Sequence, residues 1–141
     1  MLRADHVVPT TCPYCGVGCQ INLHIQDNLI YRIDGRFDND VNRGMLCVKG
    51  RFGCDFVHAP DRLTTPLKRT GPRGELAKTP IGWDEALAEI SGRLRDIRHE
   101  YGPDSIGVLT SAKCTNEENY LVQKFARGVI GTNNVDHCAR L

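Results

Sequence analysis

The spacing of four cysteines near the start of the chain limits its possible folds more than any other feature. The pattern is C-x2-C-x3-C-x27-C, formed by Cys12, Cys15, Cys19 and Cys47. Three thiols fall within one short loop, and the fourth follows after a long gap. Pro13 fixes a backbone angle in this loop, and two nearby glycines permit unusual angles that bring N–H groups close to sulfur. We therefore expect the chain to fold around a metal centre.

The spacing alone leaves three interpretations of these thiols. A structural zinc site with four thiolates usually combines two C-x2-C pairs, whereas the remote side of this site offers only Cys47. Three ligands on one loop and one distant ligand are typical of a [4Fe–4S] cluster, in which each thiolate binds its own iron. Unligated thiols are the third interpretation. The spacing favours the cluster over zinc and over unligated thiols.

The composition is that of a globular chain and argues against several classes of function. The 141 residues are 40% hydrophobic and 25% charged, and a formal net charge of +1 creates no strong field toward nucleic acids or anionic membranes. No apolar run reaches the roughly 20 residues that span a bilayer. Seven cysteines, an odd number, argue against a disulfide framework. We therefore expect a cytoplasmic protein that binds no nucleic acid and has no membrane span.

Residues 1–60 are expected to form a small β-rich domain around the cysteines. Residues Gln20–Gln26 and 29–33 each alternate apolar and polar side chains, and an Asp-Asn pair separates them. Two alternating runs across a short polar turn predict a β-hairpin. The residues expected to share one face of its second strand are Leu29, Tyr31 and Ile33.

Residues 61–141 have the pattern of a different domain. Residues 61–80 are rich in Pro, Gly, Thr and charge, so we expect a connector with a turn at 70–74. An apolar stripe at helical spacing then predicts a helix that begins after Gly82 and ends at Gly102. The stripe consists of Leu87, Ile90, Leu94, Ile97 and Tyr101.

A short strand over residues 105–111 and a second helix over residues 117–130 complete the expected elements. Helix, strand and helix in this order indicate the opening of an α/β domain. A parallel sheet needs several strands and this half offers one, so we expect the domain to be incomplete. The predicted fold class is therefore α+β to α/β, with a small β-rich cluster-binding domain at 1–60 and the truncated start of an α/β domain at 61–141.

Five segments of the chain have a distinctive combination of residues. They are TTCPYCGVGCQINL, GMLCVKGRFGCDF, DRLTTPLKR, WDEAL and SAKCTNEENYLVQKFARGVIGTNNVDHCARL. Together they resemble the catalytic (alpha) subunit of molybdenum or tungsten formate dehydrogenases, which belong to the molybdopterin oxidoreductase family. The cysteine spacing and C-V-K-G carry the resemblance to the family, and the last segment carries the resemblance to formate dehydrogenases within it.

The resemblance implies a reaction and a set of cofactors. It implies that formate is oxidised to CO2 at molybdenum or tungsten held by bis-molybdopterin guanine dinucleotide in the α/β domain. Electrons then pass to a [4Fe–4S] cluster and on to an electron-transfer subunit or redox partner. The implied cluster ligands are Cys12, Cys15, Cys19 and Cys47.

The resemblance also places Lys49 between the cluster and the pterin, as an electron relay. A positive charge there would stabilise the reduced cluster, and a solvated surface lysine is the alternative. Weaker candidates for cofactor contact are Lys113, Asn134 and His137. Asn116 is expected to cap the second helix. Three further cysteines are expected to be small buried side chains, namely Cys54, Cys114 and Cys138.

The resemblance puts the metal ligand, selenocysteine or cysteine, directly after Leu141. We hypothesise that the reading frame is cut at a UGA codon that encodes selenocysteine, and we expect the chain alone to be inactive on formate. Three alternative functions stay open. They are another molybdopterin oxidoreductase such as a nitrate reductase, an electron-transfer module that holds only a cluster, and a zinc-stabilised domain.

Overall fold

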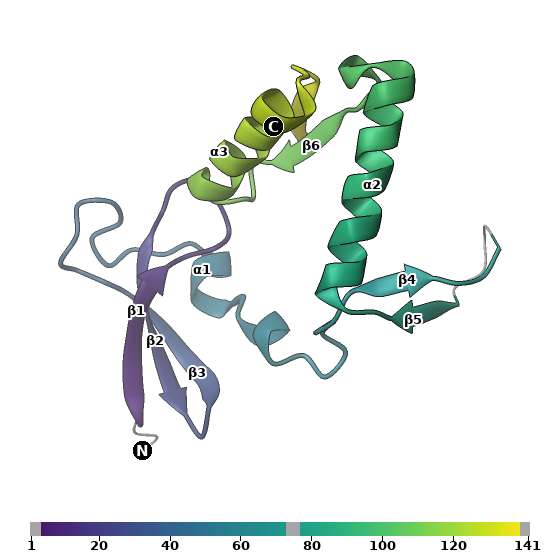
Figure 1. Ribbon diagram of the computed structural model, residues 1–141. Helices are drawn as coiled ribbons and strands as arrows, with labels where there is room; N and C mark the ends of the chain where they lie inside the picture. Colours follow the sequence, from purple (N-terminus) through teal and green to yellow (C-terminus); the bar gives the residue numbers. More distant parts are fainter. Residues whose placement is uncertain (1–3, 73–76, 139–141) are drawn as a thin grey trace.

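The computed structural model describes residues 4–72 and 77–138, and its first part is a three-stranded antiparallel sheet (Figure 1). The strands are β1 (His6–Thr11), β2 (Gln20–Gln26) and β3 (Leu29–Gly35), in the order β1-β2-β3. Helix α1 (Val48–Phe52) and the 3-10 helix η1 (Asp55–Val57) follow. The core of this part is formed by the buried side chains of Cys12, Ile21 and Ile33.

The predicted hairpin is confirmed as β2 and β3, and its register contains a bulge. Asp27 and Asn28 have positive φ angles of 49° and 61°, as a tight two-residue hairpin turn requires. The pairing shifts between His24 and Ile25, so that Ile25 lies opposite Ile30. One extra residue of β3 is therefore accommodated without a partner in β2.

The bulge changes which side chains of β3 face the core. Ile30 packs against the buried cluster, whereas Leu29 is 53% exposed. The prediction that Leu29 shares the face of Ile33 is therefore wrong. The extra residue reverses the alternation of side chains beyond the bulge, an effect that a strict period of two cannot anticipate.

Strand β1 lies outside the predicted elements. It pairs antiparallel with β2, with Val8 opposite Leu23 and Pro9 opposite Asn22, and all of its residues are exposed. Proline is tolerated in an edge strand, where its missing N–H removes little of the ladder. The β-branched residues on both sides of Pro9 favour a strand, but a proline within such a run argues against one.

The connector between the two parts contains a short hairpin. Strands β4 (Leu67–Arg69) and β5 (Lys78–Pro80) pair antiparallel. The expectation of a plain connector was therefore incomplete, and the turn expected at 70–74 lies partly outside the described residues. Helix α2 (Trp83–Tyr101) follows, with Gly82 at its N-cap and Gly102 at its C-cap with φ of 83°, and so confirms the first predicted helix.

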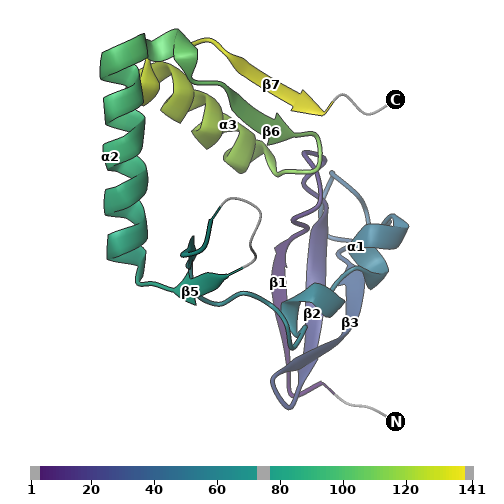
Figure 2. The ribbon, with the colours of Figure 1, turned by 90° about the vertical axis from the view of Figure 1, so that its right-hand side faces the viewer.

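The last part is a β-α-β unit, in which helix α3 accompanies two parallel strands (Figure 2). Its elements are β6 (Val108–Ser111), α3 (Asn116–Phe125), the π-helical turn η3 (Ala126–Ile130) and β7 (Val135–Cys138). Val108 lies opposite Val135 in the parallel ladder. The expectation of a single strand in this half is therefore wrong. The sequence V-D-H-C of β7 is short and mostly polar, and it becomes a strand through its pairing with β6.

The N-terminus of α3 is capped differently from the prediction. The hydroxyl of Thr115 accepts a hydrogen bond from the backbone N–H of Glu118, whose carboxylate in turn accepts one from the backbone N–H of Thr115. This capping box satisfies two donors at the helix start. Asn116 is the first residue of the helix rather than its cap, and its side chain is free for another contact.

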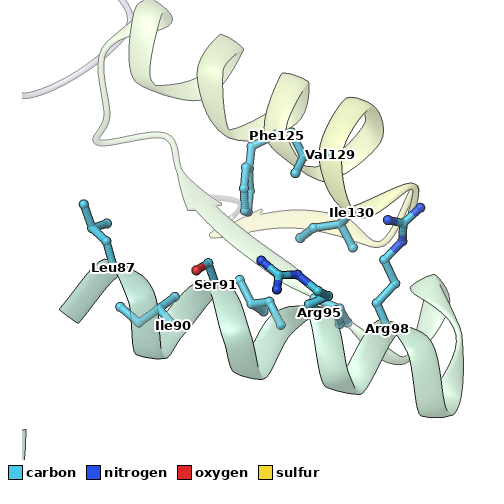
Figure 3. Close-up of a pocket in the computed structure, with 10 residues that line it drawn as sticks. Leu87, Ile90, Ser91, Arg95, Arg98, Phe125, Val129 and Ile130 are labelled. Carbon is cyan, nitrogen blue, oxygen red and sulfur yellow. The ribbon is translucent and has the colours of Figure 1, made fainter. Parts of the chain in front are cut away.

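An apolar groove of about 330 Å³ lies between α2 and the end of α3 (Figure 3). Leu87 and Ile90 reach it from the predicted stripe of α2, and Phe125 and Ile130 reach it from the opposite side. Within residues 4–72 and 77–138, none of the helices combines the length and apolarity needed to cross a membrane. The mixture of small sheets and helices agrees with the predicted α+β to α/β class.

Gly35 permits the close approach of two backbone segments, and its replacement tests the packing of this region. A Cβ atom on Gly35 would overlap the carbonyl oxygen of Gly44, whereas a Cβ atom on Gly107 would meet no atom within 4 Å. We expect Gly35→Ala to lower the free energy of unfolding by about 1–3 kcal/mol. Gly107→Ala should change it by less than about 0.5 kcal/mol. Denaturant unfolding of the two variants measures the difference, and equal midpoints would contradict the close approach.

Candidate metal centre

The cysteine loop is the connection between β1 and β2. Thr11 lies opposite Gln20 at the last rung of the ladder, and the backbone N–H of Cys12 donates to the carbonyl of Cys19 over 2.8 Å. Gly18 has a φ angle of 71°, which a residue with a side chain rarely adopts. The sheet therefore fixes both ends of the loop that carries three of the four predicted ligands.

Helix α1 brings the fourth cysteine to the loop. Cys47 is the N-cap residue of α1, and its carbonyl accepts a hydrogen bond from the backbone N–H of Arg51. Gly50 is buried on the same helix, and a Cβ atom there would lie 3.5 Å from the sulfur of Cys12. The first turn of α1 therefore lies directly against the cysteine loop.

The pKa shifts of Cys12 and Cys19 have the other cysteines of the pattern among their causes. Burial raises the pKa of Cys12, and the charges of Cys15 and Cys47 raise it further, against a backbone hydrogen bond from Tyr14 that lowers it. Burial also raises the pKa of Cys19, as do the charges of the other three cysteines. The structure thus gathers the four residues that the sequence pattern singled out.

Cys47 has the opposite shift. The backbone N–H groups of Gly50 and Lys49 point toward its sulfur and lower its pKa, and the positive charge of Lys49 adds to this effect. Backbone N–H groups directed at a thiolate stabilise its charge. Cys47 is therefore better prepared to ionise than Cys12 or Cys19.

The donor set of four thiols is one that both a zinc ion and a [4Fe–4S] cluster can use. In residues 4–72 and 77–138, no group of three or more candidate ligands is close enough to hold one ion. Thiolates around one zinc must approach to about 3.8 Å from each other, given a Zn–S bond of about 2.3 Å. A [4Fe–4S] cluster binds each thiolate through a different iron and so tolerates a wider spacing. The assignment of the four thiols to a cluster stays a prediction.

Two contacts fasten α1 to its surroundings. The hydroxyl of Tyr14, within the cysteine loop, donates to the carbonyl of Gly53. The second contact is made by Arg51 of α1, whose guanidinium lies 3.4 Å from the carboxylate of Asp34 on β3. Burial alone would raise the pKa of Asp34, but Arg32 and His24 beside it lower it, so this carboxylate stays charged and able to hold Arg51.

Lys49 is exposed and lies two residues after Cys47, in the first turn of α1. Its ammonium group has no ion pair with the part of the chain that the structure describes. This position beside the gathered thiols is compatible with the predicted relay role. The role itself stays a prediction.

The three weaker candidates divide between the two ends of the β6–β7 pair. Lys113 and His137 lie at the carboxyl ends of these parallel strands, where Ser111 is opposite Cys138, and both are exposed. Asn134 precedes β7 at the other end, and its amide donates to the carbonyl of Asp104 over 2.8 Å. The structure therefore brings Lys113 and His137 to one edge, which is the usual ligand edge of a parallel sheet, and leaves Asn134 apart.

The three cysteines outside the ligand pattern are less buried than expected. Cys54 and Cys114 are half-buried and Cys138 is exposed, which makes the prediction wrong for Cys138. The sulfur of Cys138 lies 3.1 Å from the hydroxyl of Ser111, and this contact and the backbone N–H of Ala112 lower its pKa. Its place at the end of the edge strand β7 explains the exposure.

One hydrogen bond joins the cysteine loop to the β-α-β unit. The side-chain amide of Asn116 donates to the carbonyl of Gly16 over 2.7 Å. Gly16 has no side chain, and a Cβ atom there would lie 2.6 Å from the side-chain oxygen of Asn116. The start of α3 therefore rests on the loop between Cys15 and Cys19. Neither residue's role was apparent from the cysteine pattern.

Comparison with known proteins identifies both parts of the chain. Residues 5–59 match the family described as molybdopterin oxidoreductase Fe4S4 domain, and residues 62–141 match the family described as molybdopterin oxidoreductase. The predicted resemblance to this family is confirmed. The cofactors that these descriptions name, a [4Fe–4S] cluster and a molybdopterin, are the two classes predicted from the sequence.

Curated relatives add detail. The chain is 49% identical over 134 residues to the F420-dependent formate dehydrogenase 1 subunit alpha of Methanococcus maripaludis, and 47% identical over 139 residues to formate dehydrogenase H of Escherichia coli. Each match covers 95% of this chain but 19% of the relative. The chain thus spans about a fifth of the length of these relatives.

A solved structure supports the fold. Acetylene hydratase from Pelobacter acetylenicus matches with a TM-score of 0.67 and 25% sequence identity, over 92% of this chain and 18% of that one. The arrangement of the small sheets and helices is therefore found in a larger protein of known structure.

The opposite pKa shifts of Cys47 and Cys12 predict an order of chemical modification. In the metal-free chain near neutral pH, iodoacetamide should alkylate Cys47 several-fold faster than Cys12, because the thiolate is the reactive form. Peptide mass spectrometry over time measures the order. The same reaction in denaturant, where burial and backbone hydrogen bonds are lost, is the control and should abolish the difference. Equal rates in the folded chain would contradict the predicted order.

Proposed function

The chain belongs to the molybdopterin oxidoreductase family, and we propose on that basis that it forms the N-terminal part of a formate dehydrogenase catalytic subunit. The whole protein oxidises formate to CO2, and this part receives the electrons. The observation that carries the proposal is the 47–49% identity to two formate dehydrogenase chains over 95% of the present chain.

The cysteine site supports the electron-receiving role. Cys12, Cys15, Cys19 and Cys47 would hold the [4Fe–4S] cluster, which supplies one-electron chemistry when bound. The N–H groups of Gly50 and Lys49 hold the charge of Cys47, and burial protects Cys12 from solvent. Lys49 is the proposed relay because a positive charge beside a thiolate-bound centre raises its reduction potential.

The remaining assignments complete the proposal. We assign residues 1–60 to the cluster domain and residues 61–141 to the start of the molybdopterin domain, where molybdenum or tungsten would supply two-electron chemistry on formate. Lys113 and His137 are proposed cofactor contacts from the carboxyl edge of β6 and β7. A separate electron-transfer subunit or redox partner takes the electrons onward. The cytoplasmic location expected from the sequence stays a prediction.

The reaction is proposed for the whole protein and not for this chain alone. The chain spans 19% of the length of the two formate dehydrogenase relatives, and we expect it to be inactive on formate by itself. The fold alone does not fix the reaction, since a hydratase also has it. The 47–49% identity to formate dehydrogenases, against 25% to the hydratase, is what favours formate as the substrate.

The cluster and the reaction are tested together in the whole protein that contains this chain. We expect formate, and not nitrate, to drive turnover with an artificial one-electron dye. Cys15→Ser should remove the brown absorbance of the cluster, lower the iron content and abolish dye reduction. Cys54→Ala, at a cysteine outside the ligand pattern, is the matched control and should retain all three. A Cys15→Ser protein with full iron content would contradict the ligand assignment.

The relay role of Lys49 is tested by removing its charge. Lys49→Gln should lower the reduction potential of the cluster and slow formate-driven dye reduction about tenfold, which corresponds to about 1.4 kcal/mol in the barrier. Redox titration followed by EPR and steady-state kinetics measure the two effects. Lys68→Gln is the control, because Lys68 pairs with Glu89 on α2, away from the thiols. Unchanged potential and rate in Lys49→Gln would exclude the relay.

A further inference from the structure

Asn42 is a buried amide whose polar atoms are all paired. Asn42 as a whole is 9% exposed. The side-chain oxygen accepts a hydrogen bond from the backbone N–H of Gln20 over 2.8 Å. The side-chain nitrogen donates to the carbonyl of Gln20 over 3.2 Å and to the carbonyl of Met45 over 3.0 Å. A buried amide with this set of partners is fixed in one orientation.

The partners of Asn42 flank two of the predicted ligands. Gln20 directly follows Cys19, the last cysteine of the loop, and Met45 precedes Cys47 by two residues. The side-chain amide of Asn42 thus bonds to both the N–H and the carbonyl of Gln20. Its second N–H bonds to the carbonyl of Met45, in the segment that leads to Cys47. One side chain joins the three-cysteine loop to the remote cysteine.

We infer that Asn42 is the positioning residue that delivers Cys47 to the other three thiols. This inference rests on the proposed function, in which the four cysteines hold one cluster. Cys19 and Cys47 are separated by 27 residues, and bringing the ends of such a loop together costs conformational entropy. Hydrogen bonds that fix the two ends before the cluster binds reduce that cost at the binding step.

The segment between β3 and α1 supports this role because it has little other structure. Its residues form bends and turns, and Arg43 and Gly44 both have positive φ angles, of 44° and 81°. Asn42 is itself held in place, because its backbone N–H donates to the side chain of Asn39 and its carbonyl accepts from the N–H of Met45. The segment is therefore organised around Asn42.

Other contacts also hold this region, and the N–H of Gly44 donates to the carbonyl of Arg36 over 2.7 Å, but the side chain of Asn42 bonds directly to both Gln20 and Met45. The N–H of Arg36 also donates to the carbonyl of Gln20, which ties the end of β3 to β2. Arg51 and Tyr14 fasten α1 on the far side of Cys47. Loss of the Asn42 amide would therefore loosen Cys47 while the sheet and α1 remain in place. A local effect on one ligand is expected, not general unfolding.

The test uses two substitutions in the whole protein that contains this chain. Asn42→Ala removes all three side-chain hydrogen bonds. Asn42→Asp keeps the shape and the acceptor toward Gln20 but loses both donated bonds, including the one to Met45. Asn22→Ala, at a half-buried asparagine of the same strand as Gln20, is the matched control. Iron analysis, EPR and redox titration are carried out on all of them.

The expected result is the loss of one specific iron. With ferricyanide as oxidant, a cluster whose fourth thiolate is loose releases one Fe²⁺ and gives one electron to ferricyanide, which leaves a three-iron cluster. We expect both Asn42 variants to fall from about four to about three iron atoms per cysteine site and to gain the EPR signal of an oxidised three-iron cluster. Asn22→Ala should retain the silent four-iron form of the wild type.

Several outcomes would overturn the inference. One is that both Asn42 variants keep four irons and the wild-type potential. Another is that Asn22→Ala loses iron to the same extent as the Asn42 variants. If Asn42→Ala loses the whole cluster, Asn42→Asp decides, because loss of one iron supports the role and an intact cluster with wild-type potential refutes it. A wild-type protein without iron would instead refute the proposed function. The two failures are therefore distinguishable.

Discussion

The first part of the structure depends on holding four thiols together although their ionised forms repel one another. Burial and mutual repulsion raise the pKa of Cys12 and Cys19, so the metal-free chain favours the neutral form at these two positions. The pKa of Cys47 is instead lowered by the backbone N–H groups of Gly50 and Lys49. Metal binding requires deprotonation, so cluster assembly must release protons from the buried ligands. The protein fold supplies the proximity, and the cluster would supply the positive charge that makes it favourable.

Rigid elements on three sides provide that proximity. The ladder of β1 and β2 fixes the two ends of the cysteine loop, and α1 presents Cys47 from its N-cap. Asp34 on β3 anchors α1 through Arg51, while Asn42 anchors the segment before it. The Asp34–Arg51 pair and the hydrogen bonds of Asn42 to Gln20 join residues 17 and 22 positions apart. The site is therefore a property of the whole β-rich part and not of the C-x2-C loop alone.

The elements that could be predicted are those with a strong local signal. The ligand cysteines follow from their spacing, α2 from an apolar stripe between two glycines, and the β2–β3 hairpin from alternation across an Asp-Asn turn. The elements that escaped prediction depend on a partner. Strand β7 has the sequence V-D-H-C and exists by pairing with β6, and β1 is interrupted by Pro9. Pairing between distant segments leaves no local pattern.

The same limit applies to the candidate site. Cysteines have a chemistry that singles them out, and Lys49 stands out through its place after Cys47 within a family motif. The residues that position these groups are ordinary ones. Asn42 and Asp34 differ from surface residues only in their buried or half-buried contacts, which are made to segments far along the chain. Sequence spacing identifies metal ligands well because clustered cysteines are rare in a sequence. It identifies positioning residues poorly because asparagine and aspartate are common and most of them have no such role.

The contact between Gly16 and Asn116 joins the two parts of the chain that the proposed function assigns to the cluster and to the molybdopterin. Gly16 lies between two predicted cluster ligands, and Asn116 begins the helix that follows β6. The carboxyl edge of β6 and β7, with Lys113 and His137, is therefore adjacent in the chain to the residue that touches the cluster loop. In the proposed function, this contact would help to keep the proposed cofactor edge and the cysteine site at one separation. A Cβ atom at Gly16 would meet the side-chain oxygen of Asn116 at 2.6 Å, so the Asn116 side chain would have to move and its hydrogen bond to the Gly16 carbonyl would be disturbed. The absence of a side chain at Gly16 thus preserves the contact between the cysteine loop and α3 on which the proposed electron path would depend.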